Sequence, residues 1–151
     1  MTDKKTLSEK AVKHFLDGYN CAQSVLLTMS EHWDCKSVLI PKIATGFGGG
    51  IGGCGSVCGA LTGGVMAIGT KYGTNEPSAE KRSQCYKLSQ ELFKQFKLRH
   101  GTVLCKELIQ YDLSNPDERK KARDTKVFEK KCTNFVRTSV EILLDLGETS
   151  N

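Results

Sequence analysis

The chain has 151 residues and a net charge of +5, which fits one compact domain that can bury about 70% of its unfolded surface. Its seven cysteines are too few and too irregularly spaced for a disulfide-stapled secreted scaffold. Lys and Arg are mixed with acidic residues, as in 117–131, and this pattern is typical of a solvated helix face. We therefore expect no nucleic-acid partner.

Neither a membrane span nor an export signal is predicted. Glycine and threonine interrupt the uncharged segment 43–70 before it reaches the roughly 18 consecutive apolar residues that a span needs. The N-terminal sequence MTDKKTLSEK lacks the apolar core of a signal peptide. We expect a cytoplasmic protein, and in a reducing compartment clustered cysteines favour metal binding or redox chemistry over structural disulfides.

The first part of the chain predicts two amphipathic helices. Apolar residues recur at helical spacing over 7–16, and Gly18 follows where a C-cap would stand. Asn20 is a good N-cap for a second helix, which places Cys21 at the first helical position. The uncharged segment 43–70 comes next and holds eleven of the fifteen glycines.

A third helix is predicted inside the glycine-rich segment. Residues 46–55 contain too much glycine for a regular helix and form a glycine-rich loop. Ser56 can cap a helix that ends near Gly69 or Gly73, and Cys58 would then lie in its first turn.

Glycines on this helix leave part of its surface without side chains. Gly59 and Gly63 are four residues apart, so another backbone can approach that face, either in tight helix packing or beside a cofactor. The segment 48–53 matches GxGxxG, but no strand precedes it and no acidic residue follows at the right distance. The segment 64–71 resembles a P-loop with its Lys and Thr transposed, which misplaces the phosphate-binding lysine. Neither match indicates a nucleotide site.

Two helices are predicted in the next stretch. Ser78 begins a long helix that ends at Gly101, and Cys85 lies on its apolar side as a core residue. Thr102 can cap a short helix with Cys105 in the first turn.

The C-terminal part is also helical. Residues 115–118 combine a capping Asn, a Pro at the first position and two acids, which is a strong helix start. The final helix carries Cys132 on its buried stripe and closes at Gly147. No segment alternates at period two. We therefore predict an all-α, single-domain helical bundle over 1–151, with about five to six helices and the glycine-rich loop.

Three cysteines are predicted within the first turn of a helix: Cys21, Cys58 and Cys105. Unpaired N–H groups and the helix dipole favour a thiolate there, and the thiolate is the form that attacks disulfides and binds metals. Their spacing matches neither the CxxC of thioredoxin-like proteins nor the paired CxxC of structural zinc sites. Cys54 and Cys58 form the one close pair and could be a local redox couple, although their spacing alone is not diagnostic.

The cysteine pattern resembles a known family. Tyr19-Asn20-Cys21-Ala22, the GFGGGIGG of 46–53, the CGALTG of 58–63, Cys105 and Cys132 resemble, in this order, the C_GCAxxG_C_C family. The resemblance implies a largely helical, redox-active protein of about this size. Similar domains are attached to haem-bearing split-Soret cytochromes, which would suit electron transfer and an iron–sulfur cluster. This chain has no CxxCH motif, so haem is not carried over.

The resemblance assigns one site to four cysteines: Cys21, Cys58, Cys105 and Cys132. In a dithiol version, the Cys58 thiolate attacks an oxidised partner and a second cysteine resolves the mixed disulfide, as in a thiol oxidoreductase. In a cluster version, four thiolates hold an iron–sulfur centre that moves single electrons. The backbone at Gly59 and Gly63 would approach the cofactor or the sulfurs in either version.

Other interpretations stay open from the sequence. The same cysteines could hold zinc in a non-catalytic module, or could pack as small apolar side chains. The partner would be a redox protein or a small-molecule electron donor or acceptor, and a homodimer is compatible with the sequence. The roles of Cys35, Cys54 and Cys85 are not assigned by the resemblance.

Overall fold

The computed structural model describes residues 3–150, and within this range it is helical without a β-strand. This confirms the all-α prediction. Its α-helices are α1 (Lys4–Leu16), α2 (Cys21–His32), α3 (Gly59–Tyr72), α4 (Ala79–His100), α5 (Cys105–Ile109), α6 (Pro116–Asp124) and α7 (Thr133–Thr149). A 3-10 segment, η1 (Lys42–Phe47), leads into the glycine-rich loop, and a π-helical segment, η2 (Phe128–Cys132), leads into α7.

The predicted number of five to six helices is too low. Residues 116–147 hold two helices, because α6 ends at Asp124 and the chain changes direction at Lys126. Lys126 adopts a φ of +57°, a left-handed conformation that no continuous α-helix accommodates.

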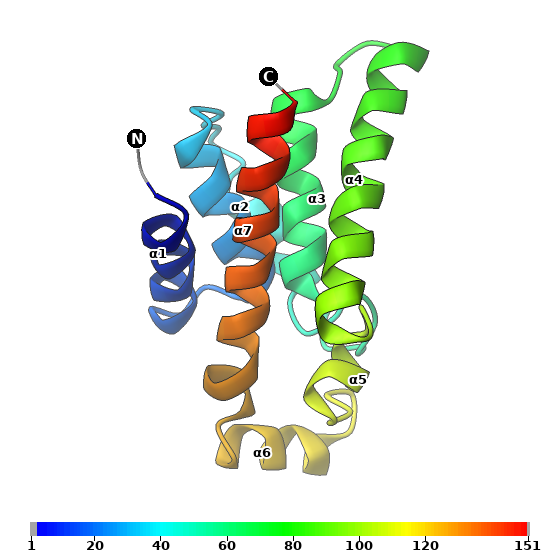
Figure 1. Cartoon of the computed structure of the whole chain (residues 1–151). Helices are drawn as coiled ribbons and strands as arrows, with labels where there is room; N and C mark the ends of the chain where they lie inside the picture. Colours follow the sequence, from blue (N-terminus) through cyan, green and yellow to red (C-terminus); the bar gives the residue numbers. More distant parts are fainter. Residues whose placement is uncertain (1–2, 151) are drawn as a thin grey trace.

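The helices form an elongated bundle in which α7 runs through the middle (Figure 1). It packs against α1 on one side and against α3 and α4 on the other, while α2 packs on α3. The largest fully buried side chains come from these helices and from α5: Leu26, Met29, Leu61, Ile68, Leu92, Phe96, Ile109, Ile142 and Leu143. No helix within residues 3–150 is long and apolar enough to cross a membrane.

Side-chain caps mark three of the helix starts as predicted. Asn20 caps α2, and the side chain of Gln23 completes a capping box by accepting from the Asn20 N–H. Ser78 caps α4, which ends at Gly101 in the left-handed conformation. Asn115 caps α6 by accepting from the first backbone N–H groups of the helix.

Two other starts lie two residues later than predicted. The N-cap of α3 is Cys58 and not Ser56, and the N-cap of α5 is Leu104 and not Thr102. The reason is a backbone pairing between these two segments, centred on an isolated antiparallel bridge of Val57 with Leu104. Pairing holds both segments extended, so neither can turn into a helix earlier.

The glycine-rich loop folds back on itself through its own backbone. The N–H of Gly53 donates to the carbonyl of Gly48, and the N–H of Ser56 donates to that of Gly50. Gly50 has a φ of +68°, and a Cβ there would lie 2.6 Å from the backbone of Ser56 and 2.8 Å from the Cβ of Cys105. The loop can therefore lie against α5 only because this residue is glycine.

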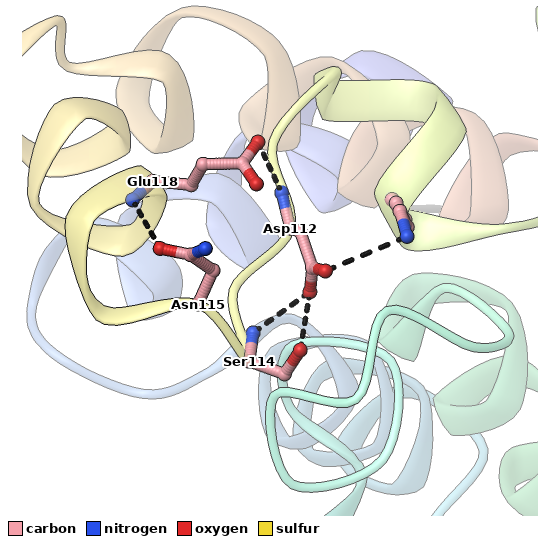
Figure 2. Close-up of polar contacts among 5 residues, drawn as sticks. Asp112, Ser114, Asn115 and Glu118 are labelled. Atoms are coloured by element: carbon pink, nitrogen blue, oxygen red, sulfur yellow. Dashed lines mark hydrogen bonds and ion pairs between the residues drawn. The ribbon is translucent and has the colours of Figure 1, made fainter.

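The connection between α5 and α6 is fixed by polar contacts (Figure 2). The Asp112 carboxylate accepts from the N–H and hydroxyl of Ser114 and, at 3.5 Å, from Lys106 at the start of α5. Glu118 on α6 accepts from the Asp112 N–H at 3.2 Å. As a result α6 lies across one end of the bundle, next to α5 (Figure 1).

The last helix continues past its predicted end. Gly147 is buried inside α7, which runs to Thr149. A Cβ on Gly147 would lie 3.4 Å from the ring of Trp33. That distance is an ordinary van der Waals contact, so Gly147 is an interior residue of α7 beside Trp33 and does not terminate the helix.

Candidate functional site

The four cysteines of the pattern line one cavity of about 520 Å³. Cys21 is the first residue of α2, Cys58 is the N-cap of α3, and Cys105 is the first residue of α5. Cys132 is the last residue of the π-helical segment before α7. Four distant parts of the chain therefore bring their thiols to one place, at the end of the bundle where α5 lies (Figure 1).

Backbone pairing places Cys58 beside Cys105. The N–H of Cys58 donates to the carbonyl of Val103 at 2.8 Å, and the N–H of Cys105 donates to that of Ser56 at 2.7 Å. Both hydrogen bonds flank the bridge of Val57 with Leu104.

The glycine after Cys58 lets Cys21 approach. A Cβ on Gly59 would collide with the Sγ of Cys21 and lie 3.0 Å from the carbonyl oxygen of Phe47. Gly59 also lines the cavity. Gly63 is not among the lining residues, and a Cβ there would collide with the backbone of Ala22, so it serves the packing of α3 on α2.

Burial keeps the four thiols neutral. It is the largest cause of a raised pKa at each cysteine, and it raises the pKa of Cys105 to about 11. The nearby sulfur of Cys21 adds to the raised pKa of Cys58, Cys105 and Cys132. The expectation that helix starts make these cysteines thiolates is therefore wrong for the protein without a bound metal, because desolvation outweighs the helix dipole.

Backbone N–H groups act in the opposite direction at Cys21. Hydrogen bonding from the N–H groups of Gly49, Ala22, Cys21 itself and Gly59 lowers the pKa of this thiol, although burial still prevails. Donors placed around a sulfur favour its charged form, and they would support a thiolate once a metal replaces the proton.

The remaining walls of the cavity are mainly apolar and aromatic. Its apolar wall residues include Phe15, Leu108, Ile109, Leu113, Phe128 and Phe135. Glu129 is the single carboxylate on the lining, and no Lys, Arg or His of the described chain belongs to it. Such a lining gives the buried sulfurs of Cys58 and Cys105 a low-dielectric environment.

A family comparison agrees with this geometry. The family model described as "Putative redox-active protein (C_GCAxxG_C_C)" matches residues 19–146, which include all four cavity cysteines. The chain belongs to the C_GCAxxG_C_C family. No curated protein and no solved structure shows significant similarity to it.

The other three cysteines of this C_GCAxxG_C_C protein lie outside the cavity lining. Cys54 is exposed on the glycine-rich loop, whereas Cys58 is buried. Cys35 follows α2 and its thiol donates to the carbonyl of Trp33 at 3.5 Å. Cys85 on α4 is half-buried and packs against the core from its edge, so the core assignment holds for one side of this thiol.

The grouping of possible ligands bears on which cofactor the four cysteines could hold. Within residues 3–150, no three His, Cys, Asp or Glu side chains are arranged to hold a single metal ion. A cluster of several irons distributes its thiolate ligands over different metal atoms, so its ligands stand farther apart than around one ion. The four cysteines around this one cavity could hold such a cluster.

Sequence reasoning missed two parts of the site. The bridge of Val57 with Leu104 has no sequence signal, because an isolated pair of residues shows no alternation. Phe135 and Leu108 were recognisable as apolar positions on their helices, but only the fold shows that they lie beside the sulfurs.

Proposed function

We propose that this protein transfers electrons, with Cys21, Cys58, Cys105 and Cys132 holding an iron–sulfur cluster. The observation that supports this most is that four thiols from separate parts of the chain line one mainly apolar cavity. Membership in a family described as redox-active agrees with the general role. When bound, the cluster would supply one-electron chemistry at a potential that its surroundings adjust.

The protonation of the thiols favours a cluster over free dithiol exchange. A nucleophilic cysteine needs a lowered pKa and some exposure, whereas Cys58 and Cys105 are buried with a raised pKa. Metal binding deprotonates a thiol outright, so a raised pKa is compatible with ligation and makes it depend on pH.

The rest of the lining would serve the same centre. Backbone N–H groups of Gly49 and Gly59 support negative charge on the Cys21 sulfur. Phe135, Leu108 and Ile109 are buried and exclude water from the floor of the cavity. Hydrogen bonds to sulfur and solvent exclusion are two of the factors that set the potential of a cluster.

The test is to purify the protein without oxygen, record its visible and electron paramagnetic resonance spectra, and assay iron, sulfide and zinc. We expect a brown protein with iron and acid-labile sulfide in equal amounts. Cys58→Ser should lose at least four fifths of the iron. Cys85→Ser, which alters a thiol outside the cavity, is the matched control and should keep its iron and spectrum.

Two outcomes would overturn the cluster. A colourless protein with stoichiometric zinc would make the site a structural metal module. A metal-free protein with a reversible two-electron thiol titration, lost in Cys58→Ser, would assign the same cysteines to thiol–disulfide exchange.

A further inference from the structure

The four-cysteine cavity has two ends of different character. Cys58 and Cys105 form part of its floor and are only 5% and 7% exposed. Leu16 and Tyr19, at the end of α1 and in the following turn, are 58% and 40% exposed and form part of its mouth. The thiols of Cys58 and Cys105 therefore lie at the inner end, and apolar side chains that face solvent lie at the outer end.

The mouth is a preformed apolar rim. Tyr19 is held by an edge-to-face contact with the ring of His14, at 5.8 Å between ring centroids, and by its N–H, which donates to the His14 carbonyl. Beside it, Gly18 is exposed and adds no side chain to the lining. Aromatic and aliphatic side chains of this kind line most sites for small molecules.

Charge narrows the ligand class further. Glu129 is the one carboxylate on the lining, it is exposed, and it takes part in no ion pair within residues 3–150. No basic side chain of this part of the chain lines the cavity. An anionic ligand such as a nucleotide or an organic phosphate would find no cation on the lining itself.

We propose that the mouth formed by Leu16 and Tyr19 binds a mainly apolar small molecule without negative charge, of the quinone type. This inference rests on the proposed function, because it assigns the class of molecule that would meet the redox centre.

The test is isothermal titration calorimetry of the purified full-length protein with 2,3-dimethyl-1,4-naphthoquinone. This probe has no free ring position next to its carbonyls, so it does not alkylate thiols. We expect one molecule to bind per chain, and the same quinone carrying a ring sulfonate to bind at least tenfold more weakly.

Two leucine variants make the test specific to the mouth. Leu16→Asp should weaken binding at least tenfold, because it places a charge on the apolar rim. Leu98→Asp is the matched control, since Leu98 is 82% exposed on α4 and does not line the cavity, and it should change binding less than twofold. Tyr19→Ala should weaken binding as well, which checks the rim at a second position.

The inference is wrong if the quinone shows no saturable binding or if Leu16→Asp and Leu98→Asp bind it equally well. Iron and sulfide assays on the same samples report on the cluster separately. Binding that persists in protein without iron would contradict the proposed cluster and leave the mouth site standing, whereas iron without quinone binding would do the reverse.

Discussion

Two glycines of the same helix, Gly59 and Gly64 of α3, show how the cysteine cavity differs from the packed core. At Gly64 a Cβ would lie 2.7 Å from Leu92 and 2.8 Å from the hydroxyl of Ser139, so neighbouring side chains fill the space that glycine leaves. At Gly59 the space is taken by the Cys21 thiol and by the backbone of Phe47. Gly64 therefore serves the packing of side chains, and Gly59 allows the Cys21 sulfur to approach α3.

Mutations in the packed core should change only the stability of the protein, and the largest effect on stability is expected there. Leu92 is fully buried between α3, α4 and α7 and does not line the cavity. Leu92→Ala should lower the free energy of unfolding by about 2–5 kcal/mol through lost burial and the void left behind. Urea denaturation measures this, and the iron content of the folded fraction should not change. A loss of iron without a loss of stability would contradict the view that the packed core and the cysteine cavity are independent.

The cysteine cavity should instead make the stability of the protein depend on pH. Burial, with Cys21 nearby, raises the pKa of Cys105 to about 11, while an unfolded cysteine titrates near 8.5. The unfolded chain therefore loses this proton first, and stability that is fully present below about pH 8.5 is lost as the pH rises to about 11. For Cys105 the loss is roughly 3 kcal/mol.

Denaturation midpoints of the metal-free protein at pH 8 and pH 10.5 check this expectation. Cys105→Ala removes the titrating thiol, so its midpoint should fall less between these two pH values than that of the unaltered protein. An equal fall in the midpoint for both proteins would show that Cys105 is not held as a buried neutral thiol.

An alanine at Gly59 tests the approach of the Cys21 sulfur directly. Gly59→Ala should lower the free energy of unfolding by about 1–3 kcal/mol, because the new Cβ pushes the Cys21 sulfur and the backbone of Phe47 away from α3. It should also reduce iron incorporation. Gly69→Ala, in the same helix with nothing within 4 Å of its Cβ position, is the matched control and should stabilise by up to about 1 kcal/mol. Thermal unfolding of the two variants should move in opposite directions.

The smallest effect is expected at the surface of α6, near the cavity but outside it. Lys120 and Asp124 form an exposed ion pair at 2.9 Å, one helical turn apart. Lys120→Gln should change the free energy of unfolding by no more than about 0.5 kcal/mol, and salt should reduce the difference. A larger loss in urea denaturation would mean that α6 depends on this pair and not on its Asn115 cap.

The parts of the fold that could be predicted from the sequence are those with a local chemical signal. Asn20, Ser78 and Asn115 are capping side chains, and each marks the start of its helix. The starts of α3 and α5 were misplaced because distant backbone groups, and not local side chains, hold the residues before Cys58 and Cys105 extended.

The site was predicted only through its resemblance to a family pattern. Spacing along the chain does not show that Cys21 and Cys132 line one cavity, because that depends on how α2 and α7 pack. The same limit applies to Gly147, which was predicted as a helix end but lies inside α7, packed beside Trp33.

The bridge between Val57 and Leu104 has a consequence for how the protein is made. These two residues are separated by the whole of α3 and α4, so they can meet only after that helical hairpin has closed. Cys132 is synthesised later still. A chain emerging from the ribosome therefore presents its thiols singly, and the complete set of four exists only when the C-terminal helix has docked, which makes any assembly on these sulfurs one of the last events in maturation.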